Sequence, residues 1–431
     1  MTQHSIAHIR ITPIAFRDPP LLNAAGIHEP WALRSIIELE TESGLVGINE
    51  SYGDQPMLAA MAKAAPSLQG LSPWALNEME ARVTALLAPD TSNAASEFQG
   101  THISLAPGTH VSKTVAKVIS AFEVAMMDLQ GQLANAPVVD LLGGAARDSV
   151  PYSAYLFFKY AEHIDRPYAP DAWGEALTSE QIVGQARRMT DAYGFKSIKL
   201  KAGALLPELE ADAVLALAKA FPGAPLRIDP NGNWRVATSL SVVEKLRGVL
   251  EYYEDPAPGL DGMASVAQAC EVPLATNMVV TDLKEFRRNA EMGCPVKIVL
   301  SDHHYWGGLR ATQRLALMCE TFGLGLSMHS NSHLGVSLMA MTHLAASVPH
   351  LSYACDTHYP WQDDEVVQGG RLRFEAGSMR VPRSPGLGVQ LDREALSRLH
   401  DNYLNTTIRH RDDLAQMRKY DPDFSGQQPR F

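Results

Sequence analysis

Short apolar segments alternate with helical stretches in the second part of the chain, from about residue 150 onward. Several of these apolar segments end in a polar or charged residue, and successive ends are 23 to 28 positions apart. One strand–helix unit of an eight-unit barrel has about this length, and catalytic residues of such barrels lie where the strands end. The pattern therefore predicts an α/β barrel with its chemistry at one mouth. The strand-end residues are Lys201, Asp229, Glu254, Asn277, Asp302, His329 and Asp356.

The first part of the chain has a different pattern. Segments 9–14 and 33–40 partly alternate apolar and polar residues, as strands do, whereas 55–87 and 113–133 have helical periodicity. Residues 89–108 are small and polar, and we expect them to form a mobile loop that acts as a lid. The mixture of strands and helices predicts a separate α+β domain.

These patterns divide the chain into three parts. We expect the α+β domain over residues 1–140, the barrel over 150–385 and a final segment over 386–431. The final segment contains a turn cluster, one helical stretch and a polar tail. Because chain ends without apolar anchors are often mobile, we expect the last few residues to be poorly ordered.

Composition narrows the classes of partner. The chain has 37 Lys and Arg against 48 Asp and Glu, a net charge of −11, which disfavours nucleic acid as a partner. No apolar run reaches the ~18 residues of a membrane span, and the first residues do not resemble a signal peptide. The four cysteines are widely spaced, as free thiols are. We therefore expect a cytoplasmic protein with no membrane partner.

Two lysines lie on one face of a predicted strand. Lys199 and Lys201 alternate with Ile198 and Leu200, so their side chains leave the same face about 6.6 Å apart. Like charge and burial each lower the pKa of an ammonium group, as a general base requires. The alternative is that both lysines lie at a solvated strand end and have no catalytic role.

Three of the predicted strand ends carry side chains whose only possible metal ligands are oxygen atoms. Asp229, Glu254 and Asn277 end three successive strands, which lie about 4.8 Å apart, so their oxygens can converge on one cation. Oxygen ligands select a hard metal such as Mg²⁺. Taken alone, the Asp229-Pro-Asn231-Gly turn is equally typical of a loop cap.

A histidine and an aspartate end two later strands. Asp302 precedes His329 by one strand, and a carboxylate beside an imidazole fixes its tautomer and raises its basicity. The order of strands places Lys201 and His329 on opposite sides of the oxygen cluster. A carboxylate bound between two bases is the arrangement for removing its α-proton. A histidine at a strand end is also often structural.

Seven motifs occur together in a fixed order. They are 195–202, Asp229-Pro-Asn-Gly, Glu254-Asp-Pro, Ala275-Thr-Asn-Met, His329-Ser-Asn-Ser-His333, Asp356-Thr-His358 and Arg411-Asp-Asp413. In these motifs the chain resembles the enolase superfamily, in its mandelate-racemase-like branch, and within that branch the glucarate dehydratases. The resemblance implies a (β/α)7β modified TIM barrel under an N-terminal α+β capping domain, to which the segment 386–431 returns.

The same resemblance implies roles for particular residues. Lys201 is then the base on one face with Lys199 assisting, and His329 paired with Asp302 acts on the other. Mg²⁺ is held by Asp229, Glu254 and Asn277. The residues expected to bind substrate are His28, Thr109, Tyr155, Asn231, Asn331, His358 and Arg411.

One departure from the family affects the metal site. The glucarate dehydratases that the chain resembles have a longer loop after Glu-Asp-Pro with its own acidic residue, whereas here the loop is shortened to 257–261. Asp261 is therefore the alternative to Glu254 as metal ligand. The segment 27–31 also matches only loosely, and that region sets the choice of substrate.

The expected function is Mg²⁺-dependent dehydration of an acid sugar, D-glucarate and its epimer L-idarate, to 5-dehydro-4-deoxy-D-glucarate. Another acid-sugar dehydratase or an epimerase remains an alternative, as does a non-catalytic relative. Asp302-His303-His304 and the His329…His333 pair leave a zinc hydrolase open. A Schiff-base aldolase is a further alternative, because Lys199 or Lys201 could form the Schiff base. Beyond the small-molecule substrate, the expected partner is a second copy of the chain in a homo-oligomer.

Overall fold

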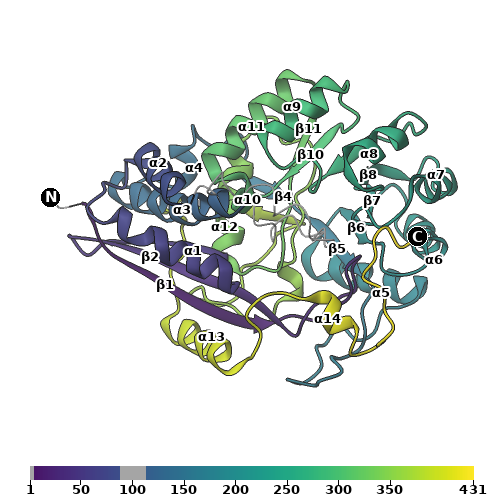
Figure 1. The fold of residues 1–431 in the computed structure, drawn as a ribbon, viewed down its shortest axis with the longest axis horizontal. Helices are drawn as coiled ribbons and strands as arrows, with labels where there is room; N and C mark the ends of the chain where they lie inside the picture. Colours follow the sequence, from purple (N-terminus) through teal and green to yellow (C-terminus); the bar gives the residue numbers. More distant parts are fainter. Residues whose placement is uncertain (1–3, 88–112) are drawn as a thin grey trace.

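The computed structural model describes residues 4–87 and 113–431 (Figure 1). The N-terminal part is an antiparallel sheet in the order β1-β2-β3 with helices packed on it. Its centre is β2, in which Ile37 pairs with Ile11 and Asn49. The elements are β1 (Ile6–Arg17), β2 (Trp31–Thr41), β3 (Val46–Tyr52), α1 (Gln55–Ala64), η1 (Ala65–Leu68), α2 (Leu76–Leu87), α3 (Thr114–Ala134) and α4 (Val138–Leu141).

The helical stretch predicted over 55–87 is three elements rather than one. Helix α1 ends before Pro66, a residue that lacks the backbone N–H an α-helix needs. Gly70 has φ +79°, which turns the chain before α2 begins. The buried side of the sheet is covered by α3, whose residues 120–131 are all buried.

The second part is a curled parallel sheet of seven strands in the order β11-β10-β9-β8-β7-β6-β5. Its strands are β5 (Ser153–Phe157), β6 (Ser197–Lys201), β7 (Leu226–Asp229), β8 (Leu250–Glu254), β9 (Leu274–Thr276), β10 (Ile298–Ser301) and β11 (Gly325–Met328). The helices that follow or flank them are α5 (Ser179–Tyr193), α6 (Pro207–Ala220), α7 (Val236–Lys245), α8 (Gly259–Ala267), α9 (Leu283–Glu291), α10 (His303–Trp306), α11 (Leu309–Thr321) and α12 (Gly335–Ser347).

The segment 352–356 closes the sheet into a barrel. On one side the N–H of Asp356 donates to Met328 O of β11 at 2.9 Å, and on the other the N–H of Ser153 in β5 donates to Cys355 O at 2.9 Å. The eighth position is therefore filled by a short irregular strand. The predicted barrel with a capping domain is confirmed.

The last part of the chain touches both domains. It contains η6 (Tyr359–Trp361), β12 (Ser378–Arg380), which pairs with β4 (Ser149–Pro151), then α13 (Arg393–Asn405) and α14 (Asp413–Met417). Helix α13 packs on β1, and the chain then continues to the barrel.

The tail is held there, and the expectation of poorly ordered last residues is wrong. Arg430 Nη2 donates to Gly203 O at 2.8 Å, and Arg430 N donates to Asn233 Oδ1 at 2.9 Å. These bonds tie the tail to the loops that follow β6 and β7.

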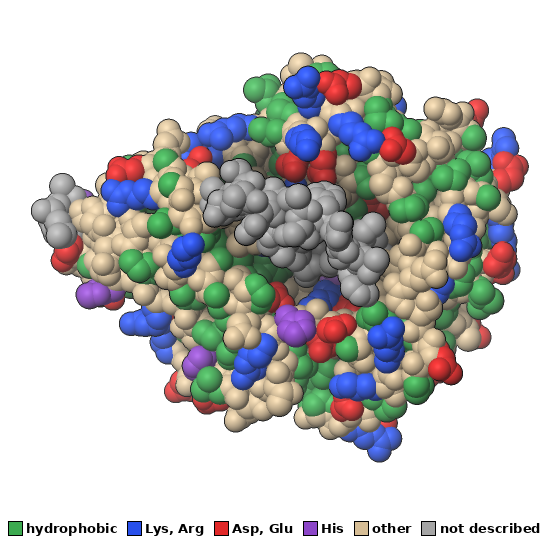
Figure 2. All heavy atoms as spheres, viewed as in Figure 1, with side chains coloured by type: hydrophobic (Ala, Val, Ile, Leu, Met, Phe, Trp, Pro, Cys, Tyr) green, Lys and Arg blue, Asp and Glu red, His purple; other side chains and the backbone are tan. Residues whose placement is uncertain are grey.

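The surface carries charges of both signs. Figure 2 shows Lys and Arg side chains interspersed with Asp and Glu side chains on the face viewed. Within residues 4–87 and 113–431, no helix is long and apolar enough to cross a membrane.

Candidate active site

Four charged or amide side chains gather at the carboxyl ends of neighbouring strands. Lys201 ends β6, Asp229 ends β7, Glu254 ends β8, and Asn277 directly follows β9. All four are at most 6% exposed. Parallel pairing brings the ends together, because Lys201 lies opposite Asp229 and Glu254 lies opposite Ala275. The barrel thus places the predicted residues at one buried mouth.

The oxygens at this mouth form a cluster suited to a hard cation. Ligand oxygens of Asp229, Glu254 and Asp255 lie within 4.8 Å of one another. The N–H of Asn277 donates to Asp255 Oδ2 at 3.1 Å, and Asn277 Oδ1 is buried without a hydrogen-bond partner among the described residues. A buried polar atom normally has a partner. An oxygen-binding cation would fit between Asn277 Oδ1 and the carboxylates of Asp229 and Glu254.

The electrostatics of this cluster also favour a cation. Burial raises the pKa of Glu254 well above its usual value, and the neighbouring charge of Asp229 raises it further. Burial acts in the same direction on the pKa of Asp229, but Lys201 and Lys199 outweigh it and lower that pKa. Two carboxylates this close repel each other, and positive charge relieves the repulsion.

The two lysines have different surroundings. Lys201 Nζ lies 2.6 Å from Asp229 Oδ2 and 2.7 Å from Asn231 Oδ1. Lys199 Nζ lies 2.6 Å from Glu254 Oε1 and 2.7 Å from Asp356 Oδ2.

These contacts correct the expectation of a lowered pKa for Lys199. Burial does lower the pKa of Lys199, but the carboxylates of Asp356 and Glu254 outweigh it and raise that pKa well above its usual value. Lys199 is therefore held as a cation. Asp356, whose role the sequence left unassigned, is one of its two closest partners.

The predicted histidine–aspartate pair is present, with a third member. His329 Nδ1 lies 3.4 Å from Asp302 Oδ2, while His304 Nδ1 lies 2.7 Å from Asp302 Oδ1. Burial raises the pKa of Asp302, but His304 and His329 outweigh it and bring that pKa well below its usual value. His304 Nε2 in turn lies 3.2 Å from Arg34 Nη2 of β2. Sequence reasoning missed this contact, because Arg34 is 270 residues away.

The zinc interpretation of Asp302-His303-His304 finds little support. These three residues do lie together. However, His304 uses Nδ1 for Asp302, and its Nε2 faces the Arg34 guanidinium, which would repel a cation. The His329…His333 pair does not supply a further zinc ligand from His333, because His333 Nε2 lies 3.1 Å from Thr357 Oγ1.

Asp261 lies away from the oxygen cluster. It is on α8, its side chain is 78% exposed, and its carboxylate lies 2.8 Å from Arg288 Nη2. The geometry therefore favours Glu254 over Asp261 as the second oxygen ligand.

The residues expected to bind substrate fall into two groups. Tyr155 and Asn231 join the cluster, since Tyr155 OH lies 3.4 Å from Asp229 Oδ2 and Asn231 contacts Lys201. His28 and His358 stack with ring centroids 6.3 Å apart, and the ring of His358 lies 4.7 Å from that of Tyr155. These four side chains form a continuous surface from the barrel mouth toward the capping domain. Thr109 and the predicted loop 89–108 lie outside the described residues.

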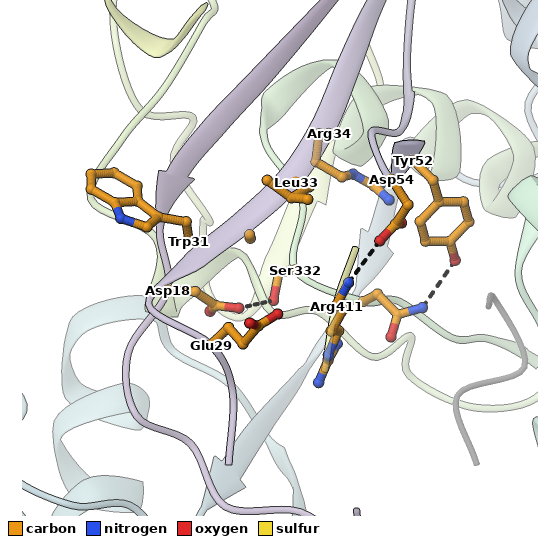
Figure 3. Close-up of a pocket in the computed structure, with 11 residues that line it drawn as sticks. Asp18, Glu29, Trp31, Leu33, Arg34, Tyr52, Asp54, Ser332 and Arg411 are labelled. Atoms are coloured by element: carbon orange, nitrogen blue, oxygen red, sulfur yellow. Dashed lines mark hydrogen bonds between the residues drawn. The ribbon is translucent and has the colours of Figure 1, made fainter. Parts of the chain in front are cut away.

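The second group lines a cavity between the capping domain and the barrel (Figure 3). Asn331 Nδ2 donates to Tyr52 OH at 3.0 Å, and Arg411 forms a two-point ion pair with Asp413. The cavity has a volume of about 50 Å³ and is lined by Asp18, Glu29, Trp31, Ala32, Leu33, Arg34, Tyr52, Asp54, Asn331, Ser332 and Arg411.

Asp18 connects this cavity to the first group. Its Oδ2 accepts from Ser332 Oγ at 2.9 Å and lies 3.0 Å from His28 Nδ1. Neither Asp18 nor Glu29 was given a role from the sequence. Glu29 lies in the segment 27–31 that was expected to set the choice of substrate, whereas nothing in the sequence pointed to Asp18.

Comparison with known proteins covers both domains. Residues 181–395 match the family described as enolase C-terminal domain-like, and residues 31–143 match the mandelate racemase / muconate lactonizing enzyme N-terminal domain. A Streptomyces coelicolor protein named probable glucarate dehydratase is 49% identical over 424 residues, 97% of each chain.

Solved structures are similar over the full length. An enolase from Pseudomonas fluorescens with bound magnesium, potassium and tartrate is 58% identical, with a TM-score of 0.94 over 100% of both chains. An enolase from Thermobispora bispora complexed with magnesium and formate is 50% identical, with a TM-score of 0.93 over 99% of this chain and 100% of that one. Both domains therefore have counterparts in known proteins.

Proposed function

The chain belongs to the enolase superfamily, and from that premise we propose that it is a Mg²⁺-dependent acid-sugar dehydratase. The substrate that we propose is D-glucarate, with its epimer L-idarate, and the product is 5-dehydro-4-deoxy-D-glucarate. One observation carries the proposal. Asp229, Glu254 and Asn277 lie at the ends of β7, β8 and β9, which stand between β6, the strand of Lys201, and β11, the strand that His329 follows.

Asp229, Glu254 and Asn277 are the residues that would hold the cation, and Lys199 balances the remaining carboxylate charge. When bound, Mg²⁺ supplies positive charge that stabilises a substrate carboxylate as its α-proton leaves. The chain's own residues do the rest of the chemistry.

Lys201 removes the α-proton on one face of the substrate. Its Nζ is held by Asp229 and Asn231 at the end of β6, and Lys199 cannot take that role while its carboxylate partners keep it protonated. General-base catalysis of this kind contributes about 10²- to 10⁴-fold.

His329 serves the opposite face. Asp302 orients its ring through Nδ1, which leaves Nε2 for the substrate. For D-glucarate, Nε2 donates a proton to the departing β-hydroxyl. For the epimer, Nε2 also takes the α-proton, because that proton lies on the face away from Lys201. Asp302 keeps the ring in the required tautomer.

The remaining contacts orient the sugar chain. In our proposal, Tyr155 and Asn231 lie at the end that bears the reacting carboxylate, and His28 and His358 lie along the chain. Asn331 and Arg411 lie at the far end, where the cavity of Figure 3 is found. Thr109 would close over the sugar from the capping domain.

The names of similar proteins support an acid sugar as substrate. The Streptomyces coelicolor protein is named as a probable glucarate dehydratase, and the Pseudomonas fluorescens structure contains tartrate, itself a hydroxylated diacid.

A substrate screen tests the proposal. Purified protein with Mg²⁺ is offered a library of aldaric and aldonic acids, and keto-acid product is measured for each. We expect turnover of D-glucarate and L-idarate, and turnover of D-glucarate at least ~10²-fold lower in the Lys201→Met variant. Turnover of a different acid sugar would keep the dehydratase and change the substrate. Epimer formation without keto acid would replace the dehydratase with an epimerase.

A further inference from the structure

The cavity between the capping domain and the barrel contains more acidic than free basic groups. Three carboxylates line it, those of Asp18, Glu29 and Asp54, together with the guanidinium groups of Arg34 and Arg411. Both guanidinium groups are already paired with carboxylates outside the lining. Arg34 Nε lies 3.1 Å from Glu50 Oε1, and Arg411 Nη2 lies 2.5 Å from Asp413 Oδ2.

Two of the three lining carboxylates, those of Glu29 and Asp54, each keep one oxygen without a hydrogen-bond partner among the described residues. Asp18 is engaged by His28 and Ser332, and Asp54 Oδ1 accepts from the N–H of Arg411 at 3.0 Å. Glu29 Oε2 accepts from the N–H of Asp412 at 2.8 Å, which leaves Oε1 without a partner among the described residues. Glu29 is therefore available to a ligand through Oε1.

The cavity also offers a donor. Arg34 is 2% exposed, and its Nη1 is buried without a hydrogen-bond partner within residues 4–87 and 113–431. A buried unpaired donor and an open carboxyl oxygen in one small cavity suit an oxygen-bearing group. A volume of about 50 Å³ holds a terminal carboxylate or hydroxymethyl group.

We propose that Glu29 determines which group can occupy the far end of the substrate. An ionised Glu29 accepts a hydrogen bond from a neutral terminal hydroxyl. Glu29 must bind a proton before a terminal carboxylate can enter, since it then donates a hydrogen bond instead of repelling the ligand. This inference rests on the proposed function, because the far end is defined only if the reacting carboxylate lies at the barrel mouth.

The surroundings of Glu29 place its titration in the neutral range. Burial raises the pKa of Glu29 to about 7, opposed by the N–H of Asp412 and reinforced by the charge of Asp413. The charged and titratable groups around it are Asp18 on the segment after β1, Arg34 on β2, Asp54 before α1, and Arg411, Asp412 and Asp413 at α14. A diacid should therefore bind better below pH 7 than above it.

Paired substrates isolate this effect from the titration of the catalytic bases. The value of kcat/KM is measured for D-glucarate and for L-gulonate, the monoacid that keeps the reacting end of D-glucarate and has a hydroxymethyl group at the far end, from pH 6 to pH 9 with Mg²⁺. The ratio of the two values cancels every titration that both substrates share. Sugar carboxyl groups are ionised throughout this range. We expect the ratio to fall about tenfold per pH unit above about pH 7.5, as one-proton uptake requires.

The variant Glu29→Gln removes the charge and keeps the size. In this variant the ratio should be flat within about twofold over the whole range. At pH 8.5 it should be about thirtyfold above the ratio of the unmodified chain, because a group with a pKa of about 7 is then ionised in all but about one molecule in thirty. Glu42→Gln, on the exposed turn between β2 and β3, is the matched control and should reproduce the unmodified profile. A ratio that does not vary with pH in the unmodified chain, or that Glu29→Gln leaves unchanged, overturns the proposal.

A binding measurement tests the role of Glu29 without requiring turnover. D-glucarate and L-gulonate, a diacid and a monoacid of equal length, are titrated calorimetrically into Mg²⁺-loaded Lys201→Met protein at pH 6.5 and pH 8.5. Weaker D-glucarate binding at the higher pH, with unchanged L-gulonate binding and no effect once Glu29→Gln is added, supports the role of Glu29 even if neither acid is dehydrated. Equal behaviour of the two ligands contradicts it, whether or not the protein proves to be a dehydratase.

Discussion

The barrel mouth and the capping-domain cavity hold charged groups in opposite ways. At the mouth, Lys199 and Lys201 face Asp229, Glu254 and Asp356 at 2.6 to 3.2 Å, so that each of these three carboxylates has a lysine partner. In the cavity, the carboxylates exceed the unpaired cations. The mouth is built from strand ends of one sheet, whereas the cavity is built from β2, β3 and loops of both domains. In our proposal the reaction takes place at the mouth and the cavity selects the substrate.

Removal of the cation should have the largest effect on turnover, and it should change the barrel mouth but not the cavity. Chelation is expected to reduce turnover of every acid sugar to background, and added Mg²⁺ should restore it. Melting temperature should also fall on chelation, because binding at 100 times the Kd stabilises by about 2.7 kcal/mol. Full activity of a preparation shown to be metal-free would contradict the assignment of the oxygen cluster.

His329→Asn should stop dehydration of both epimers, because the departing hydroxyl loses its proton donor. Lys201 remains, so D-glucarate should still exchange its α-proton with deuterated water, whereas L-idarate should not. NMR of each epimer in deuterated water gives the measurement. Equal exchange of both epimers would mean that the two faces are not served by separate bases.

Lys201→Met should lower turnover of D-glucarate at least ~10²-fold, the lower range of general-base contributions. The loss should appear in kcat rather than in KM, because the far-end contacts in the cavity are untouched. Steady-state kinetics at saturating Mg²⁺ measure both constants. Near-normal turnover would move the base to another residue.

His304→Gln sharpens the comparison, since His304 connects the two regions through Asp302 and Arg34. Residues that orient a reacting group through another typically contribute about 10- to 100-fold. We expect about a tenfold loss of kcat for D-glucarate and a displaced pH profile. His303→Gln is the control, because His303 forms no hydrogen bond to Asp302 in the described residues. The same loss in both variants would indicate a general packing defect of α10 instead.

The cavity variant Glu29→Gln should have the smallest effect on the reaction itself. It should change which acid sugar is used while leaving the kcat for the monoacid within about twofold. Lys201→Met, by contrast, should slow the diacid and the monoacid of the same α-carbon configuration alike. A Glu29→Gln variant that slows both substrates equally would place Glu29 with the reaction rather than with selection, and would remove the distinction between the two regions.

Strand-end residues could be found in the sequence because a parallel barrel repeats one geometry. Each strand of the series brings its last residue to the same mouth, so the interval between Lys201, Asp229 and Glu254 alone indicated their proximity. The pKa of Lys199 could not be inferred in the same way. Its direction depends on the carboxylate of Asp356, which arrives from the irregular eighth strand 157 residues later.

The sequence by itself determined the barrel, the capping domain, the family and the identity of the residues at the mouth, because periodicity and strand-end spacing are local properties of the chain. Tertiary structure decided the rest. It placed Asp261 on an exposed helix, brought Arg34 to His304, and assembled Asp18, Glu29 and Arg411 around one cavity. Those outcomes depend on segments that are far apart in the chain and that no repeating geometry relates to one another. Only packing of the two domains against each other determines which of their charges meet.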